Sequence, residues 1–191
     1  MSIWNLPIPI GKLVLGNILL IICSLFYLAW WAVAFRPHAS SGLLKSAVLL
    51  GVAAAAGIIG LVFAIQGITA AEGKRILLPE AGILAGGIIA YILLFTITYF
   101  FLKRQVTTEL FLIIGWAVLE LSVINTLYKT EYFSFGGAVA FCIITAAAVL
   151  ISLLCYISYY KLEKTAGFID GMIPLILAAA VMAAITIKAV A

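Results

Sequence analysis

Six long runs of apolar residues fill most of this chain, and each is long enough to cross a lipid bilayer. A transmembrane helix needs about 20 predominantly apolar residues. The approximate bounds of the runs are Ile10–Phe35, Leu44–Gln66, Ala81–Leu102, Thr107–Tyr128, Phe135–Tyr160 and Gly167–Ile187. Because the runs are continuously apolar and do not alternate with polar residues, they predict helices. We therefore expect an all-α, polytopic membrane protein built as a bundle of six transmembrane helices.

The composition excludes a water-soluble domain. Of 191 residues, 66% are hydrophobic, and only 11 are Lys or Arg and 7 are Asp or Glu. An ordinary soluble domain has roughly 25% charged residues. The connections between runs are short, so the sequence predicts a single transmembrane domain over residues 1–191, multi-pass in the cell membrane. The basic residues divide almost evenly between the two predicted sides, which leaves the orientation open.

Two predicted spans carry small residues at four-residue spacing. These are Ala56, Gly60 and Ala64 in the second span, and Gly82, Gly86 and Ala90 in the third. Small residues on one face let helix backbones approach closely. We expect the second and third spans to pack tightly through these faces. The alternative is that the glycines widen a permeation path.

The most informative residue is Glu120, because it lies near the middle of the fourth span. A charged side chain at that depth costs several kcal/mol, and such residues usually face the bundle interior or water. At 100° per residue, Glu109, Trp116 and Glu120 lie within about 20° of one line along the helix. Two interpretations stay open for Glu120. It takes part in function, or it is protonated and holds helices together through a hydrogen bond.

Polar side chains on the other spans are candidates to line a pathway with Glu120. Asn17, Ser24 and Trp31 lie seven residues apart on the first span, and Thr145, Ser152 and Tyr159 repeat this spacing on the fifth. The full set of candidate pathway or polar-core residues is Glu120, Trp116, Asn17, Asn125, Ser152, Tyr156 and Asp170. Inward-facing polar groups are also common in bundles without any pathway.

The last predicted span contains Asp170, Gly171 and Pro174 close together. Proline removes one backbone hydrogen bond, so we expect a kink whose freed carbonyl is answered by a neighbour or by water. Asp170 either interacts with the dipole of this helix as a first-turn acid or belongs to a pathway.

The sequence offers no recognisable catalytic, metal or cofactor site. His38 is the only histidine, and Cys23, Cys142 and Cys155 are isolated within apolar runs. No nucleophile elbow or phosphate-binding loop is present in the sequence. We therefore predict no cofactor, and an enzyme is not the expectation. The scattered basic residues give no nucleic-acid signal.

These observations leave two hypotheses for function. The first is a small membrane transporter or channel for a small solute or ion, proton-linked through the intramembrane Glu120. The second is a non-catalytic, membrane-embedded subunit or scaffold of a larger membrane complex. The expected surroundings are the lipid bilayer and either copies of this chain or other membrane subunits.

Overall fold

The computed structural model describes residues 6–35, 43–73, 75–103 and 106–191. His38 lies outside the described residues. The helices are α1 (Ile8–Ala34), α2 (Leu43–Ala70), α3 (Glu80–Thr96), α4 (Thr108–Lys129), α5 (Phe135–Ser158), α6 (Lys164–Asp170) and α7 (Ile173–Val190). A π-helical turn, Ile97–Phe101, continues α3, and a short 3-10 turn, Tyr159–Lys161, continues α5.

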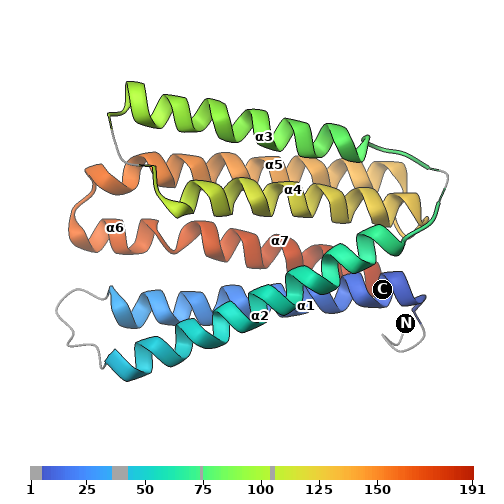
Figure 1. Ribbon diagram of the computed structural model, residues 1–191, viewed down its shortest axis with the longest axis horizontal. Helices are drawn as coiled ribbons and strands as arrows, with labels where there is room; N and C mark the ends of the chain where they lie inside the picture. The colour runs from blue at the N-terminus through green and yellow to red at the C-terminus, as the bar shows by residue number, and fades with distance from the viewer. Residues whose placement is uncertain (1–5, 36–42, 74, 104–105) are drawn as a thin grey trace.

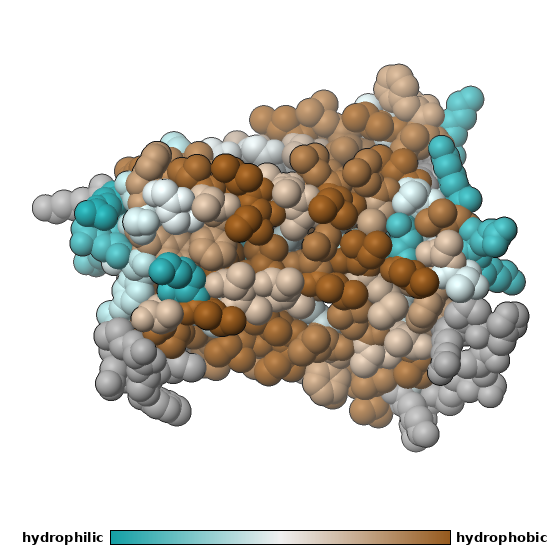
Figure 2. Space-filling model, turned by 180° about the vertical axis from the view of Figure 1, so that it is seen from behind, coloured by the Kyte–Doolittle hydropathy of each residue, from teal (hydrophilic) through white to brown (hydrophobic). Residues whose placement is uncertain are grey.

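The fold-class prediction is confirmed. The described residues contain six helical segments long and apolar enough to cross a membrane, with α6 and α7 forming the sixth. The segments run antiparallel to their chain neighbours, so Ile8 and Val190 lie at the same end of the bundle (Figure 1). We call this the terminal end, and the opposite end, where α1 ends and α4 begins, the cavity end. Most of the surface between the two ends is apolar, as expected for lipid contact (Figure 2).

The helices pack in a spatial order that differs from the chain order. α1 packs on α2 and α7, α7 on α5, α5 on α4, and α4 on α3. This places α2 and α3 at opposite edges of the bundle (Figure 1). The expectation that the second and third spans pack on each other is therefore wrong, because each has a different partner helix.

The small-residue face of α2 packs against α1. A Cβ atom built on Gly16 of α1 would lie 2.6 Å from the backbone nitrogen of Ala64, and one built on Gly60 would lie 3.0 Å from the carbonyl oxygen of Gly16. The two backbones are therefore in direct contact. The corresponding face of α3 is different, since Gly82 and Gly86 are exposed and nothing lies within 4 Å of a Cβ built on Gly86.

An apolar cluster closes the terminal end. Five of its buried members, which we call the apolar seal, come from α1, α4, α7 and the turn between α4 and α5. They are Ile10, Leu13, Leu127, Phe133 and Ile185. The backbone N–H of Phe133 donates to the carbonyl of Leu127 at 3.0 Å, which holds the turn against the end of α4.

The contact between α1 and α2 predicts a sharp difference between two glycines of α1. Gly16→Val would push a side chain into the α2 backbone, whereas Gly11→Val would meet open space, since nothing lies within 4 Å of a Cβ there. We expect Gly16→Val to lower the free energy of unfolding by about 1–3 kcal/mol, as overpacking does. Unfolding in mixed micelles measures both variants. Equal stability of the two would contradict the close approach.

Candidate functional site

The last span is broken about a quarter of the way along its length. α6 ends at Asp170, and α7 begins at Ile173 with Pro174 in its first turn. Proline is tolerated there but has no N–H to give to the carbonyl of Asp170. The N–H of Met172 turns back to the carbonyl of Ile169 at 3.0 Å. The predicted kink is therefore a break in the helical hydrogen bonds, although Gly171 and Met172 keep right-handed helical backbone angles. Asp170 stands at the end of α6 and not in the first turn of a continuous helix.

Trp31 of α1 holds this break in place. Its indole N–H donates to the carbonyl oxygen of Phe168 at 3.1 Å. The ring lies directly against Gly171, where a Cβ atom would collide with it. A neighbouring helix thus donates to a carbonyl at the break, but this carbonyl belongs to Phe168 and not to Asp170, whose carbonyl is the one that Pro174 leaves without its helical donor. The sequence did not identify Trp31 as the donor.

A cavity of about 80 Å³ lies beside the break, between α1, α4, α5 and α7. Apolar side chains, Cys155 and Gly171 form part of its wall. The remaining wall is aromatic or acidic and consists of Tyr27, Trp31, Glu109, Tyr156, Tyr159 and Asp170. Residues from opposite ends of the sequence therefore meet around one small space near the cavity end.

Both carboxylates at the cavity accept hydrogen bonds from hydroxyl groups. The hydroxyl of Ser158 lies 3.2 Å from each carboxylate oxygen of Asp170. The hydroxyl of Thr107 donates to Glu109 at 3.4 Å. Since the Ser158 hydroxyl is neutral, it positions the Asp170 carboxylate without cancelling its charge. The cavity wall is therefore acidic as well as aromatic.

Three polar side chains are buried deeper in the bundle. Asn17, Glu120 and Thr145 are all 1% exposed or less. In the described part of the chain, their side-chain polar atoms have no hydrogen-bond partner, and neither does the indole nitrogen of Trp116. A buried polar group without a partner costs roughly 1–3 kcal/mol. We call Asn17, Glu120 and Thr145 the inner polar residues.

The inner polar residues lie at similar depth below the cavity. Glu120 follows Glu109 by eleven residues on α4, Thr145 precedes Tyr156 by eleven on α5, and Asn17 precedes Tyr27 by ten on α1. At 1.5 Å per residue, each lies about 15 Å further along its helix than a cavity residue. Near this depth α4 also presents Trp116, one turn closer to the cavity.

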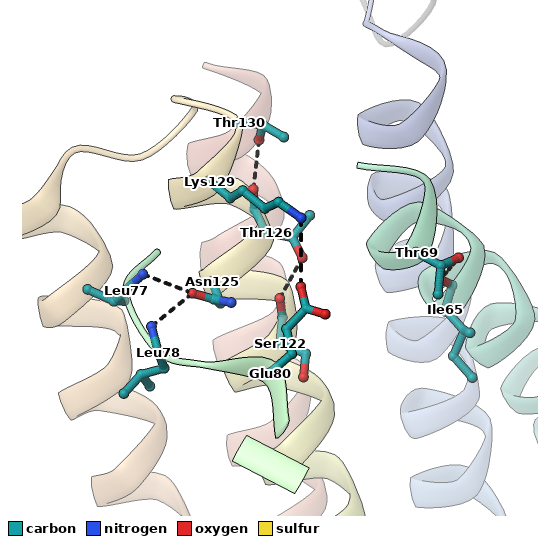
Figure 3. A network of polar contacts seen from close by, with 10 residues as sticks. All are labelled: Ile65, Thr69, Leu77, Leu78, Glu80, Ser122, Asn125, Thr126, Lys129 and Thr130. Carbon is teal, nitrogen blue, oxygen red and sulfur yellow. Dashed lines mark hydrogen bonds and ion pairs between the residues drawn. The ribbon is translucent and has the colours of Figure 1, made fainter. Parts of the chain in front are cut away.

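Two other predicted site residues make local structural contacts. The hydroxyl of Ser152 is buried and donates to the carbonyl of Ala148 at 2.8 Å within its own helix. The side-chain oxygen of Asn125 accepts from the backbone N–H groups of Leu77 and Leu78 at 3.2 and 3.1 Å (Figure 3). Asn125 therefore anchors the α2–α3 loop at the terminal end, far from the cavity along α4.

The structure thus divides the predicted site residues into groups. Tyr156 and Asp170 line the cavity, Asn17, Trp116 and Glu120 lie deeper, Ser152 lies between them along α5, and Asn125 stands apart. Sequence reasoning missed Tyr27 altogether. The available signal was its position four residues before Trp31, which places both on one face of α1.

Comparison with known protein families, curated proteins and solved structures found no match. Among the described residues, no group of three or more His, Cys, Asp or Glu side chains lies close enough to hold a metal ion. The cavity and the inner polar residues are therefore the candidate functional features of the described structure.

The anchoring of the break predicts an effect of Trp31→Phe. This substitution keeps an aromatic ring but removes the N–H that reaches Phe168, so we expect a loss of about 1 kcal/mol of unfolding free energy. Trp30→Phe is the matched control, because Trp30 packs against the rings of Tyr27 and Phe35 and does not hold the break. Unfolding in mixed micelles measures the unfolding free energies of the two variants. A larger loss for Trp30→Phe would contradict the assigned role of Trp31.

Proposed function

We propose that this protein is a small transporter or channel of the cell membrane for a small solute or ion, linked to protons through Glu120. The observation that carries the proposal is the burial of Glu120. Both of its carboxyl oxygens lack a hydrogen-bond partner in the described structure. No other Asp, Glu, Lys or Arg of the described helices lies more than two turns from a helix end.

The alternative role of Glu120, as a structural link between helices, requires a partner on a neighbouring helix. The described residues provide none, and Asn17 and Thr145 at similar depth also lack partners. In a membrane, such groups persist when they serve a substrate, an ion or a proton. Water or a solute that enters from the cavity would satisfy them, which is why we favour transport.

The two ends of the bundle differ in their packing, and a transporter or gated channel needs such a difference. The cavity opens the interior near one end, while the apolar seal closes the other. A solute that reached Glu120 from the cavity would therefore be stopped before it crossed. Passage then requires a second arrangement in which the seal opens, which favours a transporter or gated channel over an open pore.

The proposal predicts that Glu120 couples solute movement to protons. Proteoliposomes that contain a pH-sensitive dye would receive small cations, neutral solutes and anions in turn. We expect at least one solute class to drive an internal pH change with the wild-type protein. Glu120→Gln should lower that change about tenfold or more, because an amide cannot exchange a proton.

Glu72→Gln is the matched control for this experiment. Glu72 is an exposed carboxylate in the α2–α3 loop, so the same chemical change there should leave coupling intact. Equal coupling by wild type and Glu120→Gln at equal protein levels would remove Glu120 from the mechanism. No response to any solute by the wild-type protein would contradict transport itself.

A membrane subunit or scaffold is the second candidate, and the outer face of α3 favours it. Gly82 and Gly86 are exposed there, as at helix interfaces in membranes. The burial of Glu120 counts against one version of this role. At 0% exposure, Glu120 is out of reach of a polar group on another chain.

Native mass spectrometry after extraction in gentle detergent separates the two candidates. The subunit role predicts foreign chains in fixed stoichiometry, because the α3 face would then be covered by another protein. The transporter role predicts only copies of this chain. An inert chain that always carries the same partners would overturn our preferred function.

A further inference from the structure

We infer that the cavity at the α6–α7 break binds a small monovalent cation of the ammonium type. This inference rests on the proposed function and names the class of solute that would pass from the cavity to Glu120. It is carried by the charge of the cavity wall, its aromatic rings, its size and the charge of the bundle interior.

The charge of the wall excludes an anion and favours a cation. Asp170 and Glu109 line the cavity, and none of its described lining residues is Lys or Arg. The Asp170 carboxylate accepts from the hydroxyl of Ser158 and also interacts with the thiol of Cys155. Since an ionised carboxylate has about four acceptor positions, it retains capacity for the N–H donors of a cation.

The aromatic rings complete the site on the other sides. Trp31 and Tyr159 lie with ring centroids 6.1 Å apart, and Tyr27 lines the same space. Trp31 is fixed by its hydrogen bond to Phe168, so its ring is already in place before a ligand arrives. Aromatic faces attract cations, and ammonium groups are commonly bound in this way.

The size and ligand set favour a small monovalent ion. A volume of about 80 Å³ holds only a few non-hydrogen atoms, since one water molecule occupies about 30 Å³. A divalent ion such as Ca²⁺ takes six to eight oxygen ligands. The described cavity wall offers two carboxylates on different helices among carbon-rich rings, which suits an ammonium ion better.

The deeper interior of the bundle also favours a cation over an anion. Glu120 lies on nearly the same line of α4 as Glu109, and the described helices bring no basic side chain to its depth. An anion would find no positive charge on this route. A cation would meet a carboxylate at the cavity and another about 16 Å deeper along α4.

Binding to the purified protein tests this inference without any transport. Isothermal titration in detergent would use methylammonium, acetamide and acetate, which are similar in size and differ in charge. The buffer cation would be N-methylglucamine, which is too large for the cavity. We expect methylammonium to bind at least about tenfold more tightly than acetamide or acetate, a difference of about 1.4 kcal/mol.

Two substitutions in the cavity should weaken methylammonium binding. Asp170→Asn keeps an oxygen for Ser158 but removes the charge, and we expect about a tenfold loss of affinity or more. Tyr27→Leu leaves both carboxylates and removes one ring, and should cost about threefold. Glu163→Gln is the control, because Glu163 is exposed and does not line this cavity.

The outcomes separate this inference from the proposed function. Absence of methylammonium binding, equal binding of acetamide or acetate, or full affinity in folded Asp170→Asn or Tyr27→Leu would overturn the cation site. Glu120→Gln should retain methylammonium binding, since Glu120 does not line the cavity. A protein that binds methylammonium but shows no coupled flux would keep the site and overturn the transport proposal.

Discussion

The structure depends on one constraint, which is that lipid provides no hydrogen-bond partners for the backbone. Continuous helices meet this constraint within themselves, but the sixth span does not, because Pro174 has no N–H to donate and the N–H of Met172 bonds to Ile169 and not to Phe168. Trp31 compensates by donating to Phe168 from another helix. That single bond fixes the end of α1 against the break, and the cavity lies beside the contact. The cavity is therefore formed where α1 packs against the interrupted sixth span through this hydrogen bond.

The two ends of the bundle are held in different ways, and the cavity lies near one of them. At the terminal end, Asn125 binds the α2–α3 loop and Lys129 lies 3.9 Å from Glu80 (Figure 3). Arg75 pairs with Glu131 at 3.3 Å. The two ion pairs are partly exposed, and such pairs add little stability. At the cavity end, rings and carboxylates surround a space that they do not fill. Polar groups thus close the surface at one end and line the interior at the other.

The sequence predicted the number and approximate bounds of the spans, because membrane thickness sets the length of an apolar run. It did not predict which helices pair. Small residues such as Gly60 and Gly86 permit close approach, but the spacing alone does not specify the partner, and only the α2 face is used within the chain. Glu120 was found as a candidate because a midspan carboxylate stands out. The meeting of Tyr27, Trp31 and Asp170 was not found, because it depends on tertiary contacts across the whole chain.

The inner polar residues are the part of the structure that packing alone does not explain. Replacing Glu120, Asn17 and Thr145 by apolar residues of similar size would remove an unfavourable burial without breaking any hydrogen bond of the described structure. Stability therefore gives no reason for these residues at this depth. The proposed function would give one, because a proton, a water molecule or a cation that entered from the cavity would interact with these polar groups and then leave them. Under the proposed function, these oxygens and nitrogens would be available to a solute or proton, since a site whose polar groups are fully satisfied by the protein has no capacity for its solute.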